Sequence, residues 1–266
     1  MGVTPRGRGV DVRPFPSNRR LVTAAVRAGR RIMPMHGLVD VDVTEARRLL
    51  AGHEPPLSMT AFVVASVARA AAAHPEVHAY RDWRGRLVRH RHVDVQTLVE
   101  VETRQGPFGL VQVVRDADIR SARSISAELR AVKDSPERAT TGASLRRLVP
   151  LAGHVPGLFR AMYAVMRRSV RVHRATGTVQ VTAVGMFGGG GGFALSPPTL
   201  ASLTVVVGGL SRRPRVVGED VGIRDVLDLT VTIDHDVVDG APAARFVADL
   251  RRRMEDPAAV AGAIRG

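Results

Sequence analysis

Apolar residues recur along the chain with two different periods, and the period of each segment predicts its secondary structure. In residues 37–43 (GLVDVDV) apolar and polar positions alternate, which is typical of a strand with one buried face. Short valine-rich runs bounded by turn residues indicate further strands. Strands are therefore expected at about 37–43, 86–90, 93–103, 108–115, 178–184, 200–208 and 226–234.

Apolar residues spaced by three and four positions predict helices at 17–32, 44–53, 57–74, 121–133, 155–170 and 241–255. Residues 57–74 are apolar on nearly all sides, so this helix is expected to be buried, and Pro75 ends it. Ser17 and Thr44 stand where helix N-caps are expected. Because strands and helices mix along the whole chain without a Gly/Ser linker, the sequence predicts one α/β domain.

Three segments do not fit this pattern of core elements. Residues 1–16 are rich in Gly, Pro and Arg, and we expect a flexible N-terminal arm before a folded domain at 17–266. The run GMFGGGGGF (185–193) lacks the Lys-Ser/Thr of a P-loop and precedes ALSPP, where no helix can start, so we expect a mobile hairpin loop. The amphipathic segment 155–170 is expected to pack on the body or on a partner subunit, with a membrane surface as the alternative.

Composition narrows the functional classes. The chain has no cysteine, which excludes disulfides, thiolate nucleophiles and Cys-ligated zinc. It has neither an apolar run long enough for a membrane span nor the apolar core of a signal peptide, so a cytoplasmic protein is expected. The net charge is +14, and Lys133 is the single lysine. Arginine usage in a GC-rich genome explains this charge; the alternatives are a nucleic acid, disfavoured because aromatic residues make up only 4%, and a small polyanion.

The stretch LTVTIDHDVVDGAPAARF (229–246) carries the strongest chemical signal. His235 stands between Asp234 and Asp236 at the end of an expected strand, and Asp239-Gly240 follow before a helix. A metal site is disfavoured because no second histidine lies nearby. A serine hydrolase is disfavoured because the chain contains no G-x-S-x-G motif. These exclusions leave the interpretation that His235 is a general base, which activates a thiol or hydroxyl of the substrate.

The His235-x-x-x-Asp239-Gly240 motif resembles the active-site motif of the CoA-dependent acyltransferase superfamily. Its members include chloramphenicol acetyltransferase and the catalytic core of the dihydrolipoyl acyltransferases of 2-oxo acid dehydrogenase complexes. Further segments resemble blocks of this family in the same order: SNRR…IMP (17–34), MTAFVVASVARAAAAHPEVHA (59–79), GTVQVTAVGMFG (177–188) and SPPTLASLTVVVGG (196–209). The resemblance implies a chloramphenicol acetyltransferase-like fold, a mixed β-sheet flanked by helices.

The resemblance also implies roles for individual residues. His235 matches the base that deprotonates the thiol of CoA or of a dihydrolipoyl group, and Thr182 matches the hydroxyl donor to the oxyanion. Asp239 matches a carboxylate that holds the turn through a salt bridge to Arg19, and Gly240 allows the tight turn. In the family the histidine and the hydroxyl meet across a trimer interface. A homotrimer is therefore expected, with a cubic 24-mer as the larger alternative, disfavoured because the tail PAAVAGAIRG is only weakly apolar.

Several positions depart from the family pattern. Asp236 stands where dihydrolipoyl acyltransferases commonly have arginine, and a carboxylate beside the base favours the imidazolium form. The site is therefore altered unless Asp236 points away or pairs with an arginine. Met35 and Ala183 replace a histidine and an asparagine, and His78 replaces another asparagine.

No lipoyl domain and no peripheral subunit-binding domain are recognised in the sequence. A lipoyl group would therefore come from another protein. We expect an acyltransferase that uses acyl-CoA, needs no metal, and has a dihydrolipoyl group or a small molecule as acceptor. The alternative is a non-catalytic trimeric core or assembly subunit of a 2-oxo acid dehydrogenase-like complex. The sequence does not identify the acyl group.

Overall fold

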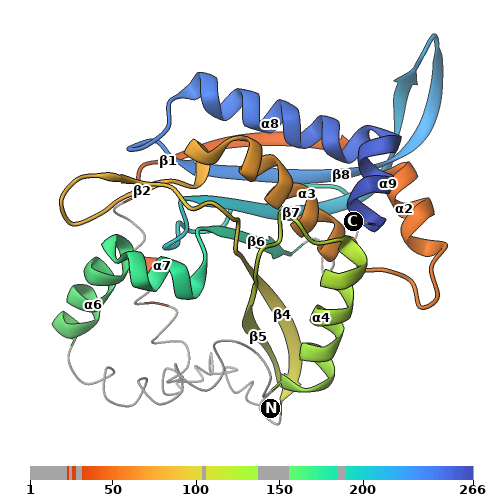
Figure 1. Ribbon diagram of the computed structural model, residues 1–266. Coiled ribbons are helices and arrows are strands. Elements are labelled where there is room, and N and C mark those ends of the chain that lie inside the picture. The colour runs from red at the N-terminus through yellow and green to blue at the C-terminus, as the bar shows by residue number, and fades with distance from the viewer. Residues whose placement is uncertain are drawn as a thin grey trace, which may run out of the picture.

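The computed structural model of the chain describes Thr23 and residues 26–27, 32–103, 106–136, 156–184 and 190–265. Its centre is a six-stranded sheet in the order β1-β8-β7-β6-β4-β5 (Figure 1). The strands are β1 (Pro34–Asp42), β4 (Val95–Thr103), β5 (Gly106–Val114), β6 (Val179–Ala183), β7 (Leu203–Val217) and β8 (Asp220–Asp234). Strand β6 runs parallel to both of its neighbours and the other pairs are antiparallel, so the sheet is mixed.

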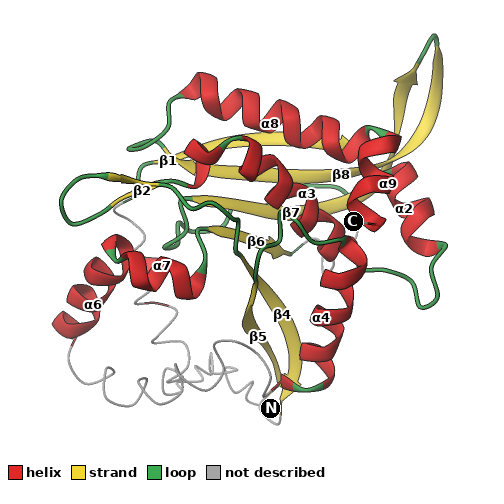
Figure 2. Cartoon of the chain, in the orientation of Figure 1, coloured by secondary structure: helices red, strands yellow, loops and turns green. Residues whose placement is uncertain are grey.

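Helices cover one face of this sheet, as Figure 2 shows. The described helices are α2 (Thr44–Ala51), α3 (Met59–Ala73), α4 (Ala122–Asp134), α6 (Pro156–Arg168), α7 (Val170–Thr176), α8 (Gly240–Glu255) and α9 (Pro257–Arg265), with a 3₁₀ turn at Pro75–His78. The short strands β2 (Tyr80–Arg81) and β3 (Leu87–Val88) form a separate ribbon. Helix α3 is buried on nearly all sides, as its sequence predicts, and packs on the sheet between α4 and α8.

The structure confirms the expected fold class of a mixed sheet flanked by helices. It differs from the sequence prediction at positions where contacts between distant residues determine the local structure. Helix 155–170 is broken: the Ser169 hydroxyl accepts from the N–H of Val172 and starts α7 as a new helix. Thr44 does not cap α2, because its hydroxyl donates to Asp42. Strands β7 and β8 each reach 15 residues, well beyond the expected bounds, and α9 was not expected.

The hairpin interpretation of the glycine-rich run is wrong, because β6 and β7, which it connects, are parallel. The described residues of the glycine-rich run, 190–193, pack against β7. The N–H of Gly192 donates to the buried carboxylate of Asp228 (2.6 Å), and the N–H of Gly209 donates to the Gly192 carbonyl (2.8 Å). A Cβ at Gly208 would lie 2.4 Å from that carbonyl oxygen, so this close approach requires glycine. Residues 185–189 lie outside the described chain.

Several predictions fall partly or wholly outside the described residues. These are the arm at 1–16, most of the helix at 17–32 and part of the segment 134–176. Within the described segments, no helix has both the length and the apolar character that crossing a bilayer requires.

Candidate active site

The turn that carries His235 is fixed through its backbone. Strand β8 ends at Asp234, whose N–H donates to the Ser202 carbonyl (3.1 Å), and the N–H of His235 donates to the Met33 carbonyl (2.8 Å). The N–H of Val237 donates back to the Asp234 carbonyl (3.1 Å). The side chain of His235 is nevertheless 51% exposed. A fixed backbone with an accessible imidazole is the arrangement that a general base requires.

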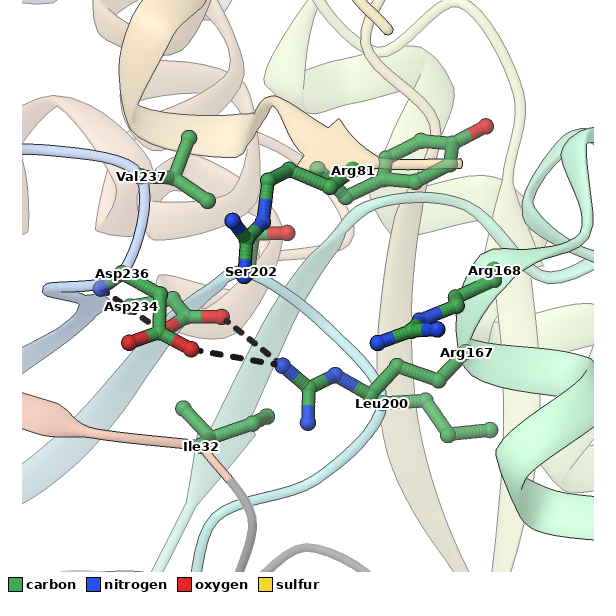
Figure 3. A pocket seen from close by; sticks show the side chains of 10 residues that line it. Ile32, Arg81, Arg167, Arg168, Leu200, Ser202, Asp234, Asp236 and Val237 are labelled. Carbon is green, nitrogen blue, oxygen red and sulfur yellow. Dashed lines mark hydrogen bonds and ion pairs between the residues drawn. The ribbon is translucent and has the colours of Figure 1, made fainter. Parts of the chain in front are cut away.

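Asp234 and Asp236 flank His235 in the sequence and share contacts of their own. The N–H of Asp236 donates to the carboxylate of Asp234 (3.2 Å). The guanidinium of Arg167, at the end of α6, lies 3.8 Å from the Asp234 carboxylate and 3.7 Å from that of Asp236 (Figure 3). Burial raises the pKa of Asp234, while the N–H of Asp236 and the guanidinium of Arg167 oppose this shift. One arginine therefore faces both carboxylates that flank the histidine.

The two carboxylates line a small hollow between the turn and the end of α6. The guanidinium groups of Arg81 and Arg168 also reach into it, as Figure 3 shows. Neither has an ion pair with any described residue. The imidazole of His235 does not line this hollow. The hollow offers positive charge for an anionic group such as a phosphate.

Asp239 is the N-cap residue of α8, but its side chain makes no capping hydrogen bond and is 92% exposed. Its carboxylate lies 3.9 Å from Nδ1 of His235, which is too long for a hydrogen bond. Gly240 is the first residue of α8, and a Cβ there would meet nothing within 4 Å, so the expected role of this glycine in a tight turn stays a prediction. Arg19 lies outside the described residues, so the Arg19–Asp239 salt bridge stays a prediction.

Thr182 lies far from His235 within the sheet. It is buried on β6 and is in register with Val206 of β7, which is in register with Thr230 of β8. His235 follows Thr230 by five residues. At about 3.3 Å per residue and about 4.8 Å per strand, the two residues are about 16 Å apart along the sheet and about 10 Å apart across it. A single chain therefore does not bring the base and the hydroxyl to one reacting carbon.

The positions that depart from the family pattern occupy ordinary places in the core. Met35 and Ala183 are partly buried and pack against the hydrophobic core. His78 is fully buried, and its Nδ1 lies 2.9 Å from the hydroxyl of Thr178. Burial lowers the pKa of His78 to about 4, so this side chain is neutral near pH 7.

Arg167 is the residue that sequence reasoning missed. The only signal was a pair of arginines near the end of an amphipathic segment, in MRRSV (166–170). Nothing in the local sequence links that pair to Asp236, 69 residues later. The link is tertiary: the Arg167 carbonyl lies 2.8 Å from Nε2 of the buried His173, and this contact helps to hold the end of α6.

Comparison with known proteins gives a consistent family. The model of the family described as 2-oxoacid dehydrogenases acyltransferase (catalytic domain) matches residues 10–143 and 168–261. One curated relative is the lipoamide acyltransferase component of the branched-chain alpha-keto acid dehydrogenase complex of Pseudomonas aeruginosa. It is 26% identical over 255 residues, which cover 90% of this chain and 50% of the relative. The chain spans about half the length of the curated relatives that it matches.

Solved structures show the same fold. A dihydrolipoamide acetyltransferase of Azotobacter vinelandii matches with a TM-score of 0.71, 17% identity and 98% coverage of both chains. The cubic core of a pyruvate dehydrogenase multienzyme complex matches with a TM-score of 0.69, 18% identity and 98% coverage of both chains. Chloramphenicol acetyltransferase matches with a TM-score of 0.52, 14% identity, and coverage of 91% of this chain and 96% of its own.

Proposed function

Because the chain belongs to the 2-oxoacid dehydrogenase acyltransferase catalytic-domain family, we propose that it transfers an acyl group between CoA and a thiol, with His235 as general base. The observation that carries the proposal is the turn after β8, where the backbone is anchored and the imidazole of His235 is accessible. A solved structure of similar fold belongs to an enzyme in which the roles of a serine, a histidine and an asparagine in catalysis were investigated. The histidine and asparagine there are four residues apart, as are His235 and Asp239 here.

The proposed reaction begins when His235 takes the proton of the attacking thiol. The thiolate adds to the carbonyl carbon of the acyl thioester, and the hydroxyl of Thr182 donates a hydrogen bond to the oxyanion that forms. The intermediate then expels the second thiolate, which recovers the proton from His235. Loss of one oxyanion donor typically lowers turnover by about 10²–10³-fold, so Thr182→Val should fall in that range.

The active site is proposed to form between two copies of the chain. Supporting this, Thr182 and His235 lie far apart in one sheet, so one copy supplies the histidine and the next supplies the hydroxyl. A closed ring of such contacts gives the expected homotrimer. A cubic 24-mer is the larger alternative, and a cubic core is among the solved structures of similar fold.

The remaining components of the proposal concern the substrates. CoA is the acyl carrier, and its phosphates would be held by arginines, for which the hollow with Arg81 and Arg168 is the described candidate. A lipoyl group would be supplied by another protein. The absence of cysteine suits a cytoplasmic location, which is part of the proposal.

The test is turnover of acetyl-CoA against a panel of acceptors that includes dihydrolipoamide. Turnover should be abolished by His235→Ala and unaffected by His92→Ala, because the His92 side chain is similarly exposed (47%) but belongs to a different part of the chain. Absence of both turnover and calorimetric CoA binding, in a chain that still assembles, would support the non-catalytic assembly subunit instead.

A further inference from the structure

The inference concerns helix α7 and its buried histidine, His173. This helix is short, but both of its ends are held. At its start, the hydroxyl of Ser169 accepts a hydrogen bond from a backbone N–H of the first turn. At its end, the guanidinium of Arg115 donates to the carbonyls of Arg174 and Ala175 (2.5 Å each). The last carbonyls of a helix have no partner within the helix, so these contacts fix α7 relative to the sheet.

The side chain of His173 is buried, and its ring stacks on that of Tyr80 from β2, with centroids 3.8 Å apart and planes inclined by 31°. Its Nε2 lies 2.8 Å from the carbonyl of Arg167. A carbonyl can only accept, so Nε2 carries the proton in this contact. Burial lowers the pKa of His173, which keeps the ring neutral near pH 7. Nδ1 has no partner among the described residues, so the bond to Arg167 is the one hydrogen bond of this ring there.

This hydrogen bond holds the end of a helix that the family model does not cover. The match to the family stops at residue 143 and resumes at residue 168, whereas α6 occupies Pro156–Arg168. The carbonyl of Arg167 is among the last of α6, so it has no acceptor role within the helix. The donor on α7 satisfies this carbonyl and thereby fixes where the backbone of Arg167 lies.

The side chain of Arg167 extends from this point toward the catalytic turn (Figure 3). Its guanidinium lies 3.7 Å from the carboxylate of Asp236 and 3.8 Å from that of Asp234. Coulomb energy falls as charges separate, so both ion pairs depend on the position of the backbone that carries the arginine. The other charged groups around the turn are Asp239, Arg81 and Arg168.

We propose that His173 is a positioning residue for acyl transfer. Its Nε2–H holds the end of α6, and α6 in turn holds the guanidinium of Arg167 beside the two carboxylates that flank His235. The counter-charge at the catalytic turn thus depends on a buried ring that lies outside the turn. The inference rests on the proposed function, because the base that Arg167 influences is the proposed base of that reaction.

The experiment compares two replacements of His173. Phenylalanine keeps an aromatic ring against Tyr80 but has no N–H, whereas the amide nitrogen of glutamine is as many bonds from Cα as Nε2 and can donate to the same carbonyl. In His173→Phe the acid limb of the kcat profile should move to higher pH, as expected for Arg167→Gln. The reason is that the two carboxylates lose counter-charge and the imidazole of His235 keeps its proton to higher pH. His173→Gln should retain the wild-type profile.

A second background tests whether His173 acts through Arg167. In Arg167→Gln, the further change His173→Phe should move the acid limb no further, because the guanidinium that it positions is already absent. The matched control is His90→Phe. Nε2 of His90 lies 3.1 Å from the hydroxyl of Tyr80, so this histidine borders the same ring, but it makes no contact with the described part of α6. Its profile should stay that of the wild-type chain.

Further readouts separate this inference from the proposed function. NMR titration of the His235 imidazole, assigned with His235→Ala, needs no acyl transfer. A titration that moves to higher pH in His173→Phe, in a chain without acyl transfer, would keep the positioning of Arg167 and remove the proposed function. A less stable His173→Phe with an unchanged profile, or a shift that adds to that of Arg167→Gln, would overturn the inference. Thermal unfolding checks folding, and His173→Met, which is flexible and has no donor, serves if His173→Phe does not fold.

Discussion

The guanidinium of Arg167 lies 3.7 Å from the carboxylate of Asp236, and 3.8 Å from that of Asp234. The histidine between these two carboxylates is the proposed base. Asp236 is the position that departs from the family pattern. An unaltered base requires that Asp236 either points away from the imidazole or pairs with an arginine, and the structure meets the second condition. The positive charge comes from α6 rather than from the turn itself.

Replacing Arg167 should therefore change the pH dependence of acyl transfer. In Arg167→Gln both carboxylates lose their counter-charge, and an imidazole near uncompensated negative charge holds its proton to higher pH. The acid limb of the kcat profile should move to higher pH. The other charged groups around the turn, Asp239, Arg81 and Arg168, are unchanged in this variant.

The control for this prediction is Arg168→Gln, which removes a neighbouring arginine of the same hollow. Its acid limb should stay close to that of the wild-type enzyme. If Arg167→Gln lowers turnover without moving the profile, the arginine supports packing only.

Asp236→Asn should leave acyl transfer nearly unchanged or move the acid limb to lower pH, because it removes negative charge near the base. Turnover lowered more than about a hundredfold, equivalent to about 2.7 kcal/mol, would show that Asp236 takes a direct part in the chemistry. The mechanism would then have to be built around a His-Asp pair.

Mixing two inactive variants should restore activity. His235→Ala lacks the base and Thr182→Val lacks the oxyanion donor. In trimers assembled at random from equal amounts, about a quarter of the interfaces combine an intact histidine with an intact threonine. Co-expressed chains should thus show about a quarter of wild-type turnover, whereas separately purified variants should show almost none. Lack of recovery in verified mixed trimers would contradict the shared site.

The buried His78 should make the fold sensitive to acid. Its pKa falls from 6.5 to about 4 on burial, so the unfolded chain binds a proton that the folded chain does not between these values. Stability from this group is present above about pH 6.5 and is lost as the pH falls toward 4. From pH 7.5 to 5.0 the wild-type chain should lose about 2 kcal/mol more unfolding free energy than His78→Asn.

Urea unfolding at the two pH values measures this difference. His92→Asn is the control, because that imidazole is 47% exposed, and it should follow the wild-type chain. Equal acid sensitivity in His78→Asn and wild type would contradict the assignment.

The Arg19–Asp239 pairing is testable by a double-mutant cycle. Asp239→Ala should lower both the thermal midpoint and turnover if Arg19 is its partner, and the same change should have little further effect in an Arg19→Ala background. Because Asp239 is 92% exposed in the described single chain, the coupling should depend on assembly. Additive effects of the two substitutions in the assembled protein would exclude the pair.

The sequence by itself determined those features that depend on neighbouring residues. The apolar character of residues 57–74 predicted a buried helix, which the structure has at Met59–Ala73. A helix that is apolar on all sides is buried whichever elements pack against it, so its neighbours need not be known. The turn at His235 could be predicted for a similar reason: a strand, a glycine and a helix in succession place the histidine between the strand and the helix. The fold class followed from the order of these elements and from the family resemblance.

Only the tertiary structure decided the features that join distant segments. The break at Ser169 brings Arg167 to Asp236 across 69 residues, and no local period records such a contact. The register of three strands places Thr182 and His235 far apart in one sheet. The outer part of the β7–β8 hairpin, residues 210–217 and 220–227, escaped prediction because proline and arginines interrupt its apolar alternation, and ion pairs to β1 and α2 hold its base. Strand register and charge pairing are set by long-range contacts, and these contacts determine which residues form the site.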